Sequence, residues 1–327
     1  MKKLMKKLLA LVLTVVILTT ACIAFTACDP QENNGGKKFK IGICQLVKHD
    51  ALDQATEGFI NALKAELGEE NVEIDMQLAD GDTNLCNTIV GNFVSKNVDL
   101  IMANATPALQ SAYNATTTIP ILGTSITEYS VALDLSNFNG VVGGNVSGTS
   151  DLAPLDKQVD MILELCPDVK TVGVIYCSSE ANSKYQVEKV TEFLAAKGVE
   201  AKAFAFSDSN DISAIVTTAA DQCDVLYVPT DNTAASCAET IGNIVREKRI
   251  PLFAGEENVA RVCGVASLSI SYYDLGVATG KMAAKILKGE ANISEMPIEY
   301  APATKKYNKE MCALLGITVP AGYEEIK

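Results

Sequence analysis

The sequence predicts an α/β protein made of two doubly wound parallel-sheet domains, joined by a hinge of several strands, with a ligand cleft between them. Three strand patterns occur twice in the same order. The first has glycine as its third residue, the second is a buried apolar run before helix-capping residues, and the third has proline as its third residue. The three pairs begin at Lys40 and Thr171, at Val98 and Cys223, and at Thr118 and Arg249. An ordered repeat of this kind predicts two domains of one design, each burying a parallel sheet between helices.

The second of these patterns contains the first candidate ligand residues. Residues 223–229 form a short apolar run, and Asp231 and Asn232 follow it at the start of a helix predicted over 234–248. Asp231 therefore lies at the carboxyl end of a strand, where open α/β sheets bind ligands. The alternative is that Asp231 or Asn232 only caps the helix. The same arrangement at residues 98–107 favours the ligand-binding interpretation.

Residues 1–27 are predicted to be an export signal of the lipoprotein type. Four lysines precede an apolar run over residues 8–18, and small residues precede Cys28. We expect lipid attachment to Cys28, with Cys22 as the weaker alternative. Residues 28–38 are polar and predict a flexible tether. The protein is therefore expected to be exported and anchored to the outer face of the cytoplasmic membrane of a Gram-positive cell.

The composition excludes several classes of function. The formal net charge is −13, and this acidity argues against nucleic acid and anionic lipid as partners. Eight of the ten cysteines follow Cys28 without CxxC spacing, and His49 is the only histidine, so neither a metal site nor a cofactor is predicted. The disulfide state of the eight cysteines stays open.

The first domain is expected to place several polar side chains at one edge of its sheet. His49 lies in the first strand-to-helix loop, where a ligand contact and a structural role are about equally expected. Thr106 and Pro107 begin a helix, whose free N–H groups suit an anion. Thr124 and Ser125 add hydroxyl groups at the end of the next strand. Strands are predicted over 39–44, 72–78, 98–103 and 118–123, and helices over 51–67, 84–96 and from 106.

The second domain repeats this order. Asn182 and Ser183 open the helix that follows its first strand, and each of them alone could be only a helix cap. Glu256 occupies the position that matches Ser125 of the first domain. Strands are predicted over 171–177, 200–206, 223–229 and 249–254. Helices are predicted after the loop 178–183, over 211–220 and over 234–248.

The last part of the chain is predicted to cross between the domains again. A strand ending at Ile270 and a helix over 273–287 would be surplus in the second domain but would complete the first. We therefore assign 39–148 and 257–292 to the first domain, and 149–256 and 293–327 to the second.

Six short motifs carry a resemblance to a known family. They span 47–53, 105–108, 144–151, 178–183, 229–233 and 272–276. Together they resemble the ABC-transporter substrate-binding proteins of the tryptophan-binding (TrpX-like) family, which have the periplasmic binding protein type I fold. The resemblance covers about residues 38–318. It implies capture of an amino acid by cleft closure, often an aromatic one such as tryptophan or phenylalanine, and delivery to a membrane permease driven by an ATPase. The sequence departs from the family pattern at Glu128 and Tyr129, next to the expected cleft.

A buried amino acid needs an anion beside its ammonium group and donors around its carboxylate, because unpaired buried charges are costly. Asp231 and Glu256 are the candidate ammonium partners. Hydroxyl and amide groups are the candidate carboxylate or orienting donors, and Leu46, His49 and Tyr129 are the candidates for the side-chain pocket. The full predicted set is Leu46, His49, Thr106, Thr124, Ser125, Asn182, Ser183, Asp231, Asn232 and Glu256. We expect a monomer.

Three alternatives remain open. The same fold could bind a nonaromatic amino acid or a small peptide. It could be a ligand sensor that reports to a receptor instead of a permease. A hydrolase using the same cleft is disfavoured, because the sequence has no metal cluster, no nucleophile elbow and no second histidine.

Overall fold

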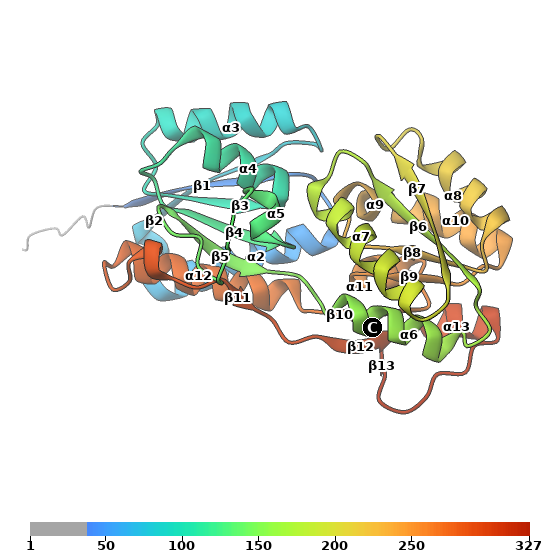
Figure 1. Ribbon diagram of the computed structural model, residues 1–327. Helices are drawn as coiled ribbons and strands as arrows, with labels where there is room; N and C mark the ends of the chain where they lie inside the picture. The colour runs from blue at the N-terminus through green and yellow to red at the C-terminus, as the bar shows by residue number, and fades with distance from the viewer. Residues whose placement is uncertain (1–37) are drawn as a thin grey trace, which may run out of the picture. The chain divides into compact units, whose positions relative to one another are not determined.

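The computed structural model describes residues 38–327, so the predicted signal peptide, Cys28 and nearly all of the tether lie outside the described residues. Two sheets organise the rest of the chain (Figure 1). The first has six parallel strands in the order β11-β5-β4-β3-β1-β2. Their bounds are β1 Phe39–Gln45, β2 Val72–Leu78, β3 Leu100–Asn104, β4 Ile121–Ile126, β5 Val146–Ser150 and β11 Glu299–Tyr300.

Helices cover both faces of the first sheet, as expected for buried parallel strands. One face packs against α3, α4 and α5, and the other packs against α2 and α12. The bounds are α2 Asp50–Leu67, α3 Thr83–Ser95, α4 Thr106–Ala115, α5 Tyr129–Ala132 and α12 Tyr272–Leu287. The repeated glycine of β1 has a packing role, because a Cβ on Gly42 would lie 2.6 Å from the ring of Phe93 in α3.

The second sheet has the strand order β13-β12-β10-β9-β8-β6-β7, and only the β10–β12 pair is antiparallel. Helices α6 and α7 pack on one face, and α8, α10 and α11 pack on the other. The strands are β6 Thr171–Cys177, β7 Glu200–Phe206, β8 Val225–Val228, β9 Leu252–Ala254, β10 Ala266–Ser269, β12 Thr304–Tyr307 and β13 Glu324–Glu325. The helices are α6 Leu155–Leu165, α7 Ala181–Ala196, α8 Ile212–Gln222, α9 Asn232–Ser236, α10 Ala238–Lys248, α11 Glu257–Val262 and α13 Lys309–Leu315. The fold class is therefore as predicted.

The described chain crosses between the sheets between β5 and α6, between β10 and α12, and between β11 and β12. The predicted return to the first domain at residue 257 is wrong. Strand β10 pairs with β9 and β12 in the second sheet, so the return comes after it, near residue 270. The last crossing is also later than residue 293, because β11 still pairs with β5.

The chain returns to the first sheet through helix α12, which makes a close contact with another helix. The sequence prediction did not use this contact. Helix α12 packs along α2, and glycines lie where the two helices meet. A Cβ on Gly58 would lie 2.1 Å from the carbonyl oxygen of Tyr273, and a Cβ on Gly276 would lie 2.0 Å from that of Ala55. Because only glycine permits this approach, these positions fix α12 on the first sheet.

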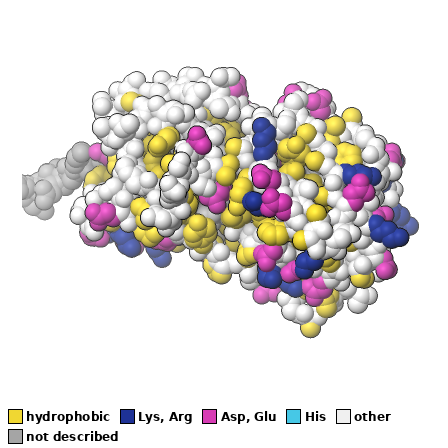
Figure 2. All heavy atoms as spheres, in the orientation of Figure 1, with side chains coloured by type: hydrophobic (Ala, Val, Ile, Leu, Met, Phe, Trp, Pro, Cys, Tyr) yellow, Lys and Arg dark blue, Asp and Glu magenta, His cyan; other side chains and the backbone are white. Residues whose placement is uncertain are grey.

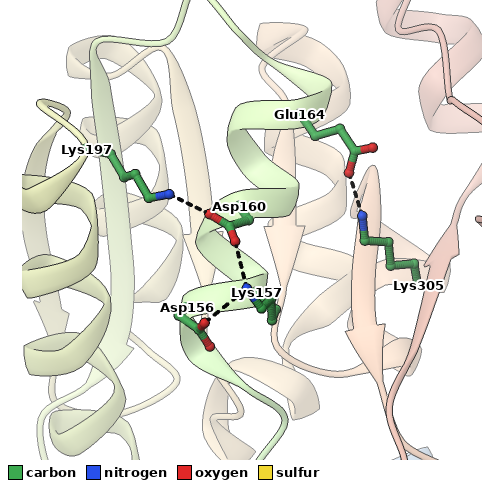
Figure 3. Close-up of polar contacts among 6 residues, drawn as sticks. All are labelled: Asp156, Lys157, Asp160, Glu164, Lys197 and Lys305. Carbon is green, nitrogen blue, oxygen red and sulfur yellow. Dashed lines mark hydrogen bonds and ion pairs between the residues drawn. The ribbon is translucent and has the colours of Figure 1, made fainter.

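We call the first sheet with its covering helices the first lobe, and the second sheet with its helices the second lobe. The second lobe carries charged side chains of both signs on its surface (Figure 2). On α6, Asp160 pairs with both Lys157 and Lys197, and Glu164 pairs with Lys305 of β12 (Figure 3). Exposed pairs of this kind contribute little to stability, about 0–1 kcal/mol each. Among residues 38–327, no helix is both long enough and apolar enough to cross a membrane.

Candidate functional site

The carboxyl ends of the two sets of strands meet in contacts between the lobes. His49, in the loop after β1, contacts Asn232 at the start of α9, with 3.4 Å between Nε2 and Oδ1. Asp50, the first residue of α2, forms an ion pair with Arg261 of α11. Helix α5 of the first lobe also contacts α7 of the second. The lobes therefore contact each other, and the predicted site residues His49 and Asn232 take part in this contact.

A buried polar cluster of the second lobe contains four of the predicted site residues: Asn182, Ser183, Asp231 and Asn232. Asp231 is the N-cap of α9, and its Oδ1 accepts from the backbone N–H of Ala234 at 2.8 Å. Its Oδ2 accepts from the N–H of Cys177 at 2.6 Å and from the hydroxyl of Ser183 at 2.7 Å. Burial and then the charge of Glu180 raise the pKa of Asp231 to about 7. Three of its roughly four acceptor positions are thus occupied by the protein itself.

Glu180 organises this cluster, and the sequence analysis did not assign it a role. Its carboxylate accepts from the backbone and side-chain N–H groups of Asn232, at 3.1 and 2.7 Å, and from the N–H and hydroxyl of Thr233. It also accepts from Asn182 at 3.1 Å. Its position in a strand-to-helix loop was a signal, but its partners come from a loop about fifty residues later in the chain.

In the first lobe, a helix start without a side-chain cap lies next to a serine that has a strained backbone and a free hydroxyl. Ala105, with φ 90°, precedes α4 and supplies no side-chain cap. Thr106 is buried in the first turn, beside Pro107. Ser125, at the end of β4, has φ 56°, and its buried Oγ has no partner among the described residues. Non-glycine residues at positive φ cluster at functional sites. A helix start together with a free hydroxyl can bind a carboxylate.

Asp151 lies at the end of β5, and the predicted site did not include it. Its Oδ2 accepts from the hydroxyl of Tyr272 at 2.9 Å, whereas its Oδ1 is buried and has no partner among residues 38–327. Burial raises its pKa to about 6. A buried carboxylate oxygen without a donor is the feature that an ammonium group would satisfy. The signal in the sequence was an acid directly after the hydroxyl-rich strand 146–150.

Three predicted residues have other surroundings than expected. Leu46 packs in the core of the first lobe. The hydroxyl of Thr124 contacts that of Thr149 at 3.2 Å, which in turn contacts Thr279 of α12, so Thr124 faces the helix layer. Glu256 caps α11, accepting from the N–H groups of the second and third following residues, and burial raises its pKa to about 7. It lines a cavity of about 260 Å³ between the lobes, together with His49 and Asp50.

Five polar atoms at or just after strand ends are buried without a partner in the part of the chain that the structure describes. They are His49 Nδ1, Asn104 Oδ1, Ser125 Oγ, Asp151 Oδ1 and Asn182 Oδ1. Leaving a buried polar group unpaired costs about 1–3 kcal/mol each. A ligand whose polar groups pair with such atoms would remove this cost.

The ligand-free protein is expected to be more stable at pH 5 than at pH 7.5. Burial raises the pKa of Asp151 to about 6 and that of Asp231 and Glu256 to about 7. The folded state therefore holds these protons more tightly than the unfolded chain. Their contribution to stability is present below the unfolded pKa near 4 and is lost as the pH rises through 6 to 7. Melting temperatures in matched buffers test this, and a melting temperature that rises from pH 5 to 7.5 would contradict it.

Comparison with known proteins identifies the family of this chain. The family model of the ABC transporter substrate binding protein matches residues 40–322. A tyrosine-binding protein of Clostridioides difficile is 37% identical over 302 residues, which are 90% of this chain and 87% of that protein.

Solved structures give the same result. One is an ABC domain in complex with L-Trp from Streptococcus pneumonia, with 36% identity, TM-score 0.83, and coverage of 87% of this chain and 97% of that one. Another is the ligand-free, open structure of a substrate-binding protein with adhesive properties from Clostridium difficile. It has 37% identity and TM-score 0.67, and it covers 88% of this chain and 99% of that one. At nearly equal identity, the chain as a whole thus superposes better on the L-Trp complex than on the open form. The chain belongs to the ABC transporter substrate-binding protein family.

Proposed function

We propose that this protein captures a free aromatic amino acid between its lobes and delivers it to an ABC importer, without catalysing a reaction. The observation that supports the proposal is that one edge of the first sheet offers both a free hydrogen-bond acceptor and free hydrogen-bond donors. Asp151 offers a buried, unpartnered oxygen to an ammonium group. Ser125 and the uncapped start of α4 offer donors to a carboxylate. An α-amino acid carries both groups on one carbon atom.

The aromatic class is supported by the relatives, which include a tyrosine-binding protein and a complex with L-Trp. A thermal-shift screen of the common amino acids tests it. A ligand that binds only the folded state stabilises it by about 2.7 kcal/mol at a hundredfold excess over its dissociation constant. We expect the largest rise in melting temperature with an aromatic amino acid. A clear rise with a sugar or nucleoside, and none with any amino acid, would refute the proposed ligand class.

We also propose that the protein is a monomer held at the membrane by a lipid on Cys28, a residue outside the described part of the chain. The proposal rests on the basic, apolar and small-residue sequence of the first 28 residues. A fatty-acid probe in growing cells should label the wild type but not Cys28→Ser. Label that persists in Cys28→Ser and disappears in Cys22→Ser would move the anchor to Cys22. Delivery to an importer is tested by uptake of the labelled amino acid, which should fall when the gene is deleted.

A further inference from the structure

The two nitrogen atoms of His49 have different surroundings. Nε2 lies 3.4 Å from Oδ1 of Asn232, across the interface between the lobes. Nδ1 is buried and has no partner among residues 38–327. In a neutral imidazole, one nitrogen donates a hydrogen bond and the other accepts one. Which nitrogen of His49 carries the proton therefore decides what its free nitrogen can bind.

Glu180 fixes the orientation of the Asn232 amide, and this orientation determines which nitrogen of His49 carries the proton. The amide Nδ2 of Asn232 donates to Glu180 at 2.7 Å, and its backbone N–H donates to the same carboxylate oxygen at 3.1 Å. The amide oxygen is therefore the atom that faces His49. Because an amide oxygen can only accept, Nε2 of His49 must be the donor. Burial lowers the pKa of His49, which favours the neutral form of the ring. Nδ1 is left as a buried acceptor.

The strand order places this acceptor away from the groups proposed for the amino and carboxylate ends of a ligand. Asp151 follows β5, and Ser125 is the last residue but one of β4. Thr106 follows β3, and His49 follows β1. These strands are neighbours in the order β5-β4-β3-β1. With strands about 4.8 Å apart, the ends of β5 and β1 are separated by about 14 Å. An amino acid bound through its ammonium group at β5 and its carboxylate at β4 and β3 would direct its side chain toward β1.

We propose that Nδ1 of His49 accepts a hydrogen bond from the ligand's side chain. The site would therefore select aromatic amino acids whose ring carries a hydrogen-bond donor. This inference rests on the proposed function. The phenol O–H of tyrosine and the indole N–H of tryptophan are such donors, and phenylalanine has none. A ligand without the donor leaves Nδ1 unpaired in a closed cleft. Asn232 and Glu180 act as positioning residues that hold the ring in the accepting state.

Calorimetric titration with tyrosine, tryptophan and phenylalanine tests the selection. Tyrosine, tryptophan or both should bind wild type about 5- to 150-fold more tightly than phenylalanine, the range set by one unpaired buried group. His49→Phe keeps a planar ring but removes the acceptor, so this ratio should fall to near one while phenylalanine binding persists. Lys281→Ala, at an exposed residue of α12, is the control and should leave the ratio unchanged.

The tautomer can be observed directly, because His49 is the only histidine in the chain. Nitrogen-15 NMR of tag-free protein should give one imidazole, with the proton on Nε2. The Nδ1 resonance should move on addition of tyrosine or tryptophan but not on addition of phenylalanine. Asn232→Ala should leave a mixture of tautomers.

Three results would overturn the inference: a proton on Nδ1, equal binding of all three amino acids by wild type, or an unchanged ratio in His49→Phe. If none of the three amino acids binds, the proposed function fails. The NMR measurement then still tests by itself whether Glu180 and Asn232 set the tautomer of His49.

Discussion

Replacing Asp151 by asparagine is expected to weaken binding of the amino acid by about 30-fold to several thousand-fold. Removing one partner of a buried charge pair costs on the order of 2–5 kcal/mol, and each 1.4 kcal/mol is a factor of ten in affinity. In the variant, the amide oxygen can still accept from Tyr272, which turns the NH₂ group toward the position proposed for the ammonium group. Two donors would then face each other in a site withdrawn from water. Calorimetric titration at pH 7.5 with the best amino acid of the screen measures the loss.

The ligand-free fold of Asp151→Asn should be at least as stable as wild type at pH 7.5. Burial already raises the pKa of Asp151, so its ionised form is unfavourable in the empty cleft, and the amide removes that charge. Asp156→Asn, which changes an exposed acid of α6 in the same way, is the matched control and should bind normally. An affinity of Asp151→Asn within threefold of wild type would exclude Asp151 as the ammonium anchor.

Replacing Asp231 by alanine is expected to destabilise the ligand-free protein by about 2–5 kcal/mol. The change strands three buried donors, from Ala234, Cys177 and Ser183, at about 1–3 kcal/mol each. Part of this loss is offset, because the variant also removes a buried charge that lies close to Glu180. At roughly 2–4 °C per kcal/mol, the melting temperature should fall by about 5–15 °C. Urea unfolding at pH 7.5 gives the free energy directly.

Asp231→Asn should give an intermediate loss of stability. An asparagine can cap α9 as well as aspartate does, but its NH₂ group would then oppose the N–H of Cys177. Asp221→Ala, at an exposed acid of α8, is the control and should melt close to wild type. If Asp231→Ala melts within 2 °C of wild type, the carboxylate is not the structural centre of the cluster. If it melts as expected but the Asn variant also loses all ligand affinity, Asp231 anchors the ligand as well.

The architecture could be predicted because its signals are local. Each signal is a short pattern that predicts the structure of its own segment. The patterns are glycine in the first strand of each repeat, proline in the last strand, and apolar runs before capping residues. Counting of strand–helix units assigned the helix at 273–287 to the first domain, but the residues at which the chain crosses between the lobes could not be predicted from local signals. Strand β10 belongs to the second sheet because it pairs with β9 and β12, and residues 266–269 carry no local mark of that partnership. Helix α12 belongs to the first lobe because its glycines meet α2, more than two hundred residues earlier in the chain.

The sequence by itself determined which side chains follow the strands, and so most of the polar residues of the candidate site, including His49, Ser125, Asn182 and Asp231. Only the tertiary structure decided which of their atoms remain free. Asp231 and Glu256 were equally good ammonium partners on sequence grounds, yet one is bonded to β6 and α7 and the other to its own helix. Asp151 keeps an oxygen free because Tyr272 approaches only the other one. The reason is physical: a residue type sets how many hydrogen bonds a side chain can form, but its neighbours in the folded chain decide how many are left for a ligand.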